Sequence, residues 1–357
     1  MTTLLVTTAQ RNYPAVVGRG CLERLGDYLP QRTGKIFVLT TRDVWQRHAT
    51  RLAPGLVGRS HEILFYPGGE EHKRLATVEA LAEEMVQRGG DRSSLLLAFG
   101  GGIVNDVGGF LAAIFMRGIP VIQLPTTLLA QVDSGLGGKT GVNLQSGKNL
   151  VGAFHQPLAV LIDPELLETL PEREYRAGLF EVIKCAVIRS PELFDLLETR
   201  REDVLARLPE PLERMIAECV RVKAEVVSAD ERETDLRRIL NFGHTFGHAL
   251  EAETGYTRLL HGEAVGIGMR AATILARRLA MLVGGDAERI LNLLDAYGPL
   301  PDVRDVSPHA LALRLRSDKK TVRGEVHFVL PEAIGRVRIV SGVDDRLVRE
   351  AIEAALS

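Results

Sequence analysis

A short segment in the second half of the chain carries four polar side chains at helical spacing. Arg237, Asn241, His244 and His248 are separated by four, three and four residues. At about 100° per residue, these side chains fall within about 60° of one another on one helix face. A cation, an amide and two imidazoles on one face are unusual for a purely structural helix. The spacing therefore predicts a functional site on a helix over residues 237–248.

Three side chains in this half of the chain can bind a metal ion. Glu181, His244 and His261 supply one carboxylate and two imidazoles. Three protein ligands with an open fourth position are typical of a catalytic zinc site. His244 and His248 are four residues apart, which is also a metal-binding spacing, so these two could ligate together instead. Both ligand sets stay open on the residues alone.

A charged pair includes one of these ligands. Lys184 follows Glu181 by three residues within a run of Leu, Phe, Val and Ile. An ordinary surface ion pair has the same spacing. Charges in apolar company, however, need a partner or a function. We expect this pair to lie inside a site.

Two segments in the first half have the chemistry of a nucleotide site. Residues 100–106 begin with three glycines after a strand-like run, and such a turn lets a helix N-terminus approach a pyrophosphate. Residues 67–73 offer the Glu70 carboxylate to ribose hydroxyls and the Lys73 ammonium to phosphate. For residues 100–106 the competing interpretation is a tight strand-to-helix turn without a ligand, because Asn105 stands where G-x-G-x-x-G has its last glycine. For residues 67–73 it is a charged turn exposed to solvent.

A third segment, residues 133–149, alternates glycine with charged and amide side chains. Lys139 and Lys148 stand among glycines and asparagines, which suits phosphate binding by point charges and backbone N–H groups. The alternative is a flexible surface loop. We expect a phosphate-binding loop here.

The elements that must position these residues change character along the chain. Residues 36–39, 62–66, 95–99 and 120–124 are short apolar runs typical of buried strands, and residues 77–88 have helical spacing. Strands that alternate with helices predict a mainly parallel sheet.

Helical periodicity dominates the second half. It covers residues 192–208, 212–227, 264–282 and 287–296, and the clearest strand-like run is 326–330. Two prolines near the end of the first half mark the point where the alternation of strands and helices gives way to helical periodicity. We therefore predict two domains, residues 1–165 and residues 166–357.

Composition limits the classes of protein that remain. The 357 residues have a net charge of −2 and 5% aromatic side chains, which argues against nucleic acid as a partner. The three cysteines cannot build a disulfide framework, and no apolar run is long enough to span a membrane. The first residues lack the features of a signal peptide. We expect a soluble, cytoplasmic protein with a small-molecule substrate and no membrane partner.

Taken in order, the motifs resemble those of the 3-dehydroquinate synthases, which belong to the sugar phosphate cyclases. The resemblance extends over nearly the whole chain and rests on residues 100–110, 116–118, 125–134, 137–143, 147–157, 181–184, 240–251, 261–265 and 318–320. It implies an α/β N-terminal domain with a mainly parallel, Rossmann-like sheet and a mostly α-helical C-terminal domain.

The resemblance also implies a reaction, a lyase step of the shikimate pathway. The substrate is 3-deoxy-D-arabino-heptulosonate 7-phosphate, and the products are 3-dehydroquinate and phosphate. NAD oxidises a ring alcohol transiently, phosphate is eliminated, and the ketone is reduced again. Ring opening and an aldol closure complete the sequence.

Carried over by motif, the residues divide into four groups. The metal ligands, for Zn²⁺ or Co²⁺, are Glu181, His244 and His261. The NAD positions are Gly69, Glu70, Lys73, Gly102, Ile103, Val104, Asn105, Asp106, Thr126, Thr127, Lys139, Lys148 and Thr169. The catalytic positions are Asp133, Lys139, Lys184, Arg237, Asn241 and His248. The further substrate positions are Arg117, Asn149, Lys223 and Lys320, of which Arg117 acts across a homodimer interface.

Three competing functions stay open. A sibling cyclase such as aminodehydroquinate synthase keeps a substrate carboxylate and so shares the need for Arg237 and Asn241. A metal-dependent alcohol dehydrogenase would form NADH in net amounts, whereas a cyclase forms none. A non-enzymatic scaffold would bind neither metal nor NAD.

Overall fold

The computed structural model describes residues 1–282, 284–317 and 326–357. These residues form two compact units. The first unit consists of Met1–Pro171 and Leu212–Arg232, and the second consists of Glu172–Pro211 and Glu233–Ser357. Residues 318–320, which include the predicted substrate residue Lys320, lie outside the described residues.

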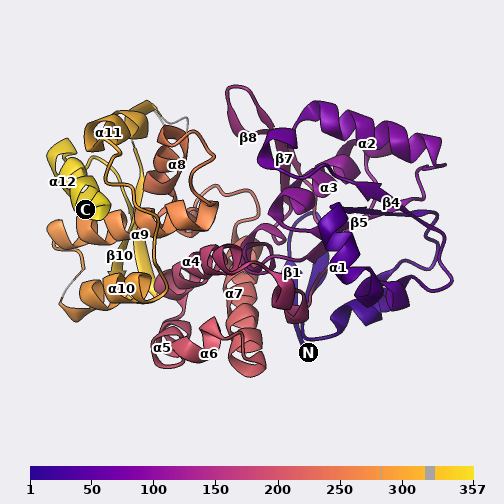
Figure 1. The fold of residues 1–357 in the computed structure, drawn as a ribbon, viewed down its shortest axis with the longest axis horizontal. Coiled ribbons are helices and arrows are strands. Elements are labelled where there is room, and N and C mark those ends of the chain that lie inside the picture. Colours follow the sequence, from indigo (N-terminus) through magenta and orange to yellow (C-terminus); the bar gives the residue numbers. More distant parts are fainter. Residues whose placement is uncertain (283, 318–325) are drawn as a thin grey trace. The chain divides into compact units, whose positions relative to one another are not determined.

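A seven-stranded sheet organises the first unit (Figure 1). In spatial order its strands are β1 (Thr2–Thr7), β2 (Asn12–Val17), β9 (Ala159–Ile162), β6 (Val121–Pro125), β5 (Leu95–Gly100), β3 (Ile36–Thr40) and β4 (His61–Phe65). All neighbours are parallel except β1 and β2. Four of these strands were predicted from their apolar runs, and the mainly parallel sheet is confirmed.

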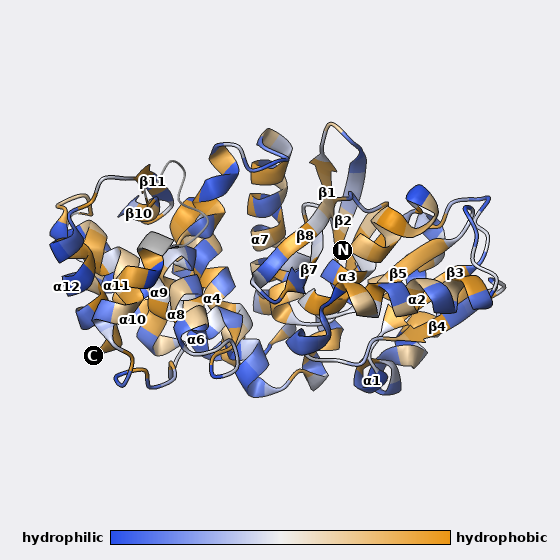
Figure 2. Cartoon of the chain, turned by 90° about the horizontal axis from the view of Figure 1, so that it is seen from above, coloured by the Kyte–Doolittle hydropathy of each residue, from blue (hydrophilic) through white to orange (hydrophobic). Residues whose placement is uncertain are grey.

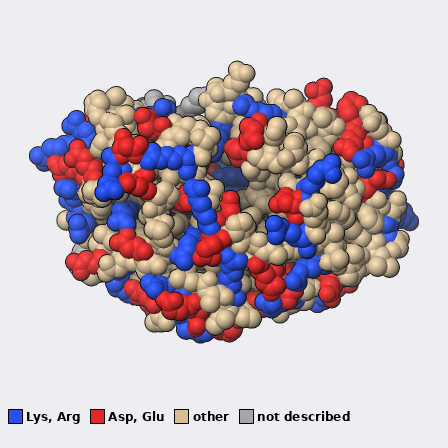
Figure 3. All heavy atoms as spheres, viewed as in Figure 1, with Lys and Arg blue, Asp and Glu red and all other residues tan. Residues whose placement is uncertain are grey.

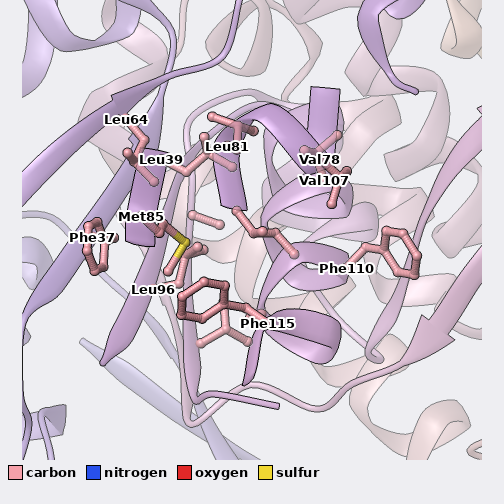
Figure 4. Close-up of a cluster of buried hydrophobic side chains, with 14 of the residues drawn as sticks. Phe37, Leu39, Leu64, Val78, Leu81, Met85, Leu96, Val107, Phe110 and Phe115 are labelled. Carbon is pink, nitrogen blue, oxygen red and sulfur yellow. The ribbon is translucent and has the colours of Figure 1, made fainter. Parts of the chain in front are cut away.

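The central strands β3, β5 and β6 are buried along their whole length. Alternate residues of a strand point to opposite faces, and both faces of this sheet are covered. Phe37, Leu39 and Leu96 pack with residues of α2 (Leu75–Gln87) and α3 (Gly102–Ile114), as Figure 4 shows. Two covered faces explain why these strands are continuous apolar runs.

The opposite face of the sheet is covered by other elements of the first unit. They are η1 (Cys21–Tyr28), α1 (Arg42–Leu52), η2 (Ala53–Leu56) and η6 (Pro164–Thr169). Shorter turns are η3 (Glu70–His72), η4 (Phe115–Arg117) and η5 (Ala130–Ser134). Figure 2 shows apolar residues along β3 and β5, whereas α1 is mostly hydrophilic.

The predicted phosphate-binding loop over residues 133–149 is largely a β-hairpin instead. The first two residues of this segment, Asp133 and Ser134, are the last two residues of η5. Further along, β7 (Lys139–Leu144) pairs antiparallel with β8 (Gly147–Phe154). The glycines allow this pairing because the strands approach closely. A Cβ atom at Gly152 would lie 2.0 Å from the Thr140 carbonyl oxygen. Dense glycine was thus a signal of close backbone packing as well as of a turn.

The second unit is mostly helical. Its helices are α4 (Glu172–Arg189), α5 (Pro191–Thr199), α6 (Arg201–Leu205), α8 (His244–Glu253), α9 (His261–Arg278), α10 (Gly285–Ala296), α11 (Pro308–Ser317) and α12 (Asp345–Leu356). It also contains η7 (Leu236–Asn241) and a hairpin of β10 (Phe328–Ala333) and β11 (Arg336–Val340). The helix α7 (Pro209–Ala229) belongs to the first unit from Leu212 onwards.

Two helices form the centre of this second unit. The α4 helix is buried on every side from Ala177 to Ile188, and α9 is buried over most of its length. A helix that is apolar all round lies in a core. The helices α8, α10 and α12 and the strand β10 pack against α9.

Charged side chains of both signs cover the surface that Figure 3 shows. Lys and Arg alternate with Asp and Glu over the face drawn in Figure 3, as the net charge of −2 implies. Among the described helices, none combines the length and the apolar character needed to cross a membrane.

Candidate active site

The predicted single helix over residues 237–248 is wrong. Arg237 and Asn241 lie on the 3₁₀ turn η7, and His244 begins the separate helix α8. Gly243 separates them with a left-handed φ of 79°, and a Cβ atom there would lie 2.6 Å from Met269 Cγ. The periodic spacing could not reveal this break, because glycine is tolerated within helical patterns.

Three histidines nevertheless come together in the second unit. His244 and His248 lie one turn apart on α8, and His261 is the first residue of α9. The ring centroid of His244 lies 5.2 Å from the ring centroid of His248 and 5.2 Å from that of His261. One ring nitrogen of each histidine lies within 4.8 Å of the other two. The cluster has the size of a metal site.

The Glu181 carboxylate faces this cluster from the middle of α4. Its Oε1 atom lies 3.7 Å from Nε2 of His244 and 3.7 Å from Nε2 of His261. Glu181 is fully buried, and its Oε1 atom accepts no hydrogen bond from the described residues. Lys184, also buried, forms an ion pair with Oε2. The pair is therefore no surface ion pair.

These residues fit a divalent metal ion. A buried carboxylate is costly unless it is paired or coordinates a metal, and Oε1 of Glu181 lies 3.7 Å from an imidazole nitrogen of both His244 and His261. One carboxylate oxygen and two imidazole nitrogens are ligands suited to Zn²⁺ and Co²⁺.

In both His244 and His261, the Nδ1 atom lies beside an oxygen acceptor. Nδ1 of His244 lies 3.2 Å from the Phe242 carbonyl oxygen, and Nδ1 of His261 lies 3.4 Å from Oε2 of Glu251. Burial lowers the pKa of the His261 imidazole, but the hydrogen bond and charge of Glu251 outweigh burial and raise the pKa above its ordinary value. Each Nε2 is left to face Glu181.

The start of α9 is fixed against α4. A Cβ atom at Gly262 would lie 1.8 Å from the Ala177 carbonyl oxygen, so only glycine allows the two helices this close. Glu263 accepts a hydrogen bond from the Leu260 backbone N–H at 2.8 Å and two from Arg173 at 2.7 and 2.8 Å. All three residues of the His-Gly-Glu motif thus have a role at this helix start.

The turn η7 packs against α4, and Arg237 is buried on it. Asn241 Nδ2 donates to Oε1 of Glu233 at 2.7 Å. Glu233 was not predicted as a site residue. It adopts a left-handed φ of 59°. Several acidic residues surround it in the sequence, and no spacing distinguishes Glu233 from them.

A second polar cluster lies in the first unit. Lys73 Nζ donates to Asp106 Oδ2 at 2.5 Å and to Asn149 Oδ1 at 2.6 Å. Asn143 Nδ2 donates to Glu70 Oε1 at 2.6 Å. Burial raises the pKa of the Asp106 carboxyl, and the Lys73 ammonium opposes that rise. Three of the predicted polar segments, from η3, α3 and the β7–β8 hairpin, are therefore joined.

The N-terminus of α3 lies after β5, as the glycine motif predicted. A Cβ atom at Gly102 would lie 2.7 Å from Ser134 Oγ, so this turn is tight. Thr126 accompanies it, because its N–H donates to the Gly100 carbonyl at 2.9 Å. Asn105 is turned inward and donates to the Ala98 carbonyl at 3.0 Å.

The remaining predicted residues of the first unit lie at several places. Lys223 of α7 donates to the Asp133 carbonyl at 2.5 Å and forms an ion pair with its carboxylate. Thr169 Oγ1 lies 2.8 Å from Nε2 of the buried His48. Gly69 directly precedes η3. The others lie on α3, in the turn after β6 and on the hairpin: Ile103, Val104, Thr127, Lys139 and Lys148.

Arg117 stands in strained backbone. It has a φ of 70°, and the preceding Met116 has a φ of 49°. Two consecutive left-handed residues without glycine are uncommon, and such strain is often retained for function. Arg117 is exposed on η4.

Solved structures of sugar phosphate cyclases share this fold. The chain has a TM-score of 0.89 and 30% identity to 2-epi-5-epi-valiolone synthase from Streptomyces hygroscopicus subsp. jinggangensis 5008, solved with NAD⁺ and Zn²⁺, and the match covers 98% of each chain. It has the same TM-score and identity to 2-deoxy-scyllo-inosose synthase complexed with carbaglucose-6-phosphate, NAD⁺ and Co²⁺, over 99% of each chain. The fold and the site define a cyclase of this class.

The sequence comparisons are more specific. Residues 63–177 match the 3-dehydroquinate synthase N-terminal family, and residues 178–321 match the C-terminal family. The 3-dehydroquinate synthase of Solibacter usitatus (strain Ellin6076) is 62% identical over the full length of both chains. The chain belongs to the 3-dehydroquinate synthase family. The family, the fold class and the lyase class predicted from the motifs are confirmed.

Proposed function

We propose that this chain converts 3-deoxy-D-arabino-heptulosonate 7-phosphate into 3-dehydroquinate and phosphate, with NAD and a Zn²⁺ or Co²⁺ ion as cofactors. The observation that carries the proposal is the buried Glu181 carboxylate, whose Oε1 atom lies 3.7 Å from two imidazole nitrogens. Membership of the family supplies the substrate. The two cyclases of known structure hold NAD⁺ together with Zn²⁺ or Co²⁺.

Glu181, His244 and His261 would hold the metal. His248 is the alternative ligand, because one ring nitrogen of each of the three histidines lies within 4.8 Å of the other two. The approach of Oε1 of Glu181 to Nε2 of both His244 and His261 supports the first set. When bound, the ion lowers the pKa of a coordinated alcohol and polarises its carbon–oxygen bond. Lys184 stays paired with the second oxygen of Glu181.

The first unit would hold NAD. The N-terminus of α3 offers backbone N–H groups and the positive end of the helix dipole to a pyrophosphate. Glu70 can accept from ribose hydroxyls, and Lys73 balances phosphate charge. The other cofactor residues are Gly69, Gly102, Ile103, Val104, Asn105, Asp106, Thr126, Thr127, Lys139, Lys148 and Thr169. NAD supplies a hydride acceptor that returns the hydride within the same turnover.

Cations and amides would bind the two anionic ends of the substrate. In the second unit, Arg237 and Asn241 suit a carboxylate, since a guanidinium and an amide both donate hydrogen bonds. In the first unit, Lys139, Asn149 and Lys223 supply further hydrogen-bond donors. Lys320, further along the sequence, supplies another positive charge.

Proton transfer would involve a small set of side chains. His248 lies beside His244, with ring centroids 5.2 Å apart, and an imidazole can donate or accept a proton. The substrate phosphate itself can accept the proton lost from the carbon next to the transient ketone, so elimination needs no further base. Asp133 and Lys184 orient donors around the reacting groups.

The proposed assembly is a homodimer in which Arg117 reaches the phosphate of the partner's substrate. The left-handed backbone at Met116 and Arg117 supports a constrained role for this exposed cation. We assign NAD binding to residues 1–165 and metal and substrate binding mainly to residues 166–357. The described cysteines are buried and form no disulfide, in keeping with a cytoplasmic enzyme.

One experiment separates this function from its rivals. The purified enzyme is supplied in parallel with the heptulosonate phosphate and with its amino analogue, and the cyclic products are identified by mass. We expect 3-dehydroquinate to form with the higher kcat/KM. Preference for the amino analogue would make the chain an aminodehydroquinate synthase instead.

A further inference from the structure

Glu251 is a buried carboxylate that the proposed chemistry does not use. It lies on α8 and is only 4% exposed. It follows His244 and His248 by seven and three residues, so all three side chains share one face of the helix. Its Oε2 atom lies 3.4 Å from Nδ1 of His261.

The two ring nitrogens of His261 therefore face two different carboxylates. Nε2 lies 3.7 Å from Oε1 of Glu181, whereas Nδ1 faces Glu251. A neutral imidazole carries one N–H, and a metal needs the lone pair of the other nitrogen. An acceptor beside Nδ1 holds the proton there and leaves Nε2 able to ligate.

His244 shows the same arrangement with a different acceptor. Its Nδ1 lies 3.2 Å from the carbonyl oxygen of Phe242, which is only two residues away. The acceptor for His261 comes from a different helix. The His261 side chain is also more exposed, at 32% against 10% for His244, so packing restrains its ring less. The orientation of His261 should depend more on its hydrogen bond.

We propose that Glu251 is a positioning residue that fixes the tautomer and ring orientation of His261 and thereby strengthens metal binding. The inference rests on the proposed ligand set of Glu181, His244 and His261. Carboxylates that hold a metal-binding histidine typically change metal affinity 10- to 100-fold when they are removed.

The test measures metal binding to the metal-free, full-length protein. Zn²⁺ affinity is obtained by competition with a chromophoric chelator, and the Co²⁺ visible spectrum reports ligand geometry. Glu251→Ala should weaken Zn²⁺ binding about 10- to 100-fold and alter the Co²⁺ spectrum. Glu251→Gln should recover most of the affinity, because its amide oxygen still accepts from Nδ1–H.

Glu253→Gln is the matched control, since it removes an acid from the same helix whose partner is Arg314. It should leave Zn²⁺ affinity unchanged. Wild-type affinity and spectrum in Glu251→Ala, or equal weakening in Glu253→Gln, would overturn the inference. Glu181→Ala separates the two proposals: if it binds Zn²⁺ as tightly as the wild type, the proposed ligand set itself is wrong.

Discussion

At the scale of single residues, Glu181 explains the composition of the histidine cluster. A carboxylate at the centre of a buried helix is stable only with compensating charge. Lys184 supplies one part of that compensation, and the two imidazole nitrogens leave space for a cation. The lysine and the two histidines around Glu181 are therefore explained by the need to compensate its buried negative charge.

His261→Ala tests the metal site directly. Removing one of three protein ligands should lower kcat at least about 100-fold, because a catalytic ion supplies several kcal/mol of stabilisation. The zinc content of the purified variant, measured by atomic absorption, should fall in parallel. His309→Ala, which removes an exposed histidine on α11, is the control and should retain both properties. Full activity of His261→Ala would exclude the ligand assignment.

Asp163 predicts a pH dependence of stability. Its buried carboxylate accepts from the backbone N–H groups of Gly20 and Glu165, each at 3.0 Å, and burial raises its pKa to about 6. Between about pH 4 and 6 the folded state binds a proton that the unfolded state has lost. The free energy of unfolding should therefore fall as pH rises through this window.

Urea unfolding of Asp163→Asn measures this contribution. The wild type should exceed the variant by about 2 kcal/mol more at pH 4.5 than at pH 6.5. An equal difference at both pH values would show that Asp163 does not titrate in this range.

At the scale of elements, the sequence predicts the strands and helices better than their junctions. Apolar runs identify β3, β5 and β6 because both faces of the sheet are covered. The helix over residues 237–248 fails because Gly243 adopts a left-handed backbone, in which a Cβ atom would clash with Met269, a residue that follows much later in the sequence. Glu233 and Glu251 were missed as site neighbours for a similar reason, since only the fold brings them to Asn241 and His261.

The contact between α4 and α9 gives an element-scale prediction. Gly262→Ala places a methyl group against the Ala177 carbonyl, so α9 must shift. We expect a loss of at least about 2 kcal/mol in the free energy of unfolding, measured in urea, and weaker Zn²⁺ binding because His261 moves with its helix.

Gly285→Ala is the matched change at the start of α10, where no described atom lies within 4 Å of the new methyl group. It should leave stability the same or raise it by about 0.4–1 kcal/mol. Equal stability of the two variants would mean that the α4–α9 contact tolerates a side chain.

At the scale of the whole molecule, 44 basic and 46 acidic side chains give a net charge of −2. On the face drawn in Figure 3, Lys and Arg lie among Asp and Glu. Glycines instead have particular places, because many of them permit close backbone contacts in the α3 turn, the hairpin and the start of α9.

The proposed dimer predicts complementation between two inactive variants. Arg117→Ala lacks the cation that serves the partner's site, and His261→Ala lacks a metal ligand in its own site. A mixed dimer contains one complete site, so an equal mixture should regain about a quarter of wild-type activity after subunit exchange. No recovery, with exchange verified by mass spectrometry, would place Arg117 in its own subunit's site.

The central claim is that NAD⁺ is reduced and then reoxidised within one turnover of an enzyme that also needs a metal ion. The most direct measurement supplies the heptulosonate phosphate in large excess over enzyme and NAD, then follows phosphate release and absorbance at 340 nm together. We predict many phosphates released per NAD with no net NADH. NADH that accumulates in step with turnover, or phosphate release that persists at full rate after NAD and metal are removed, would contradict the account.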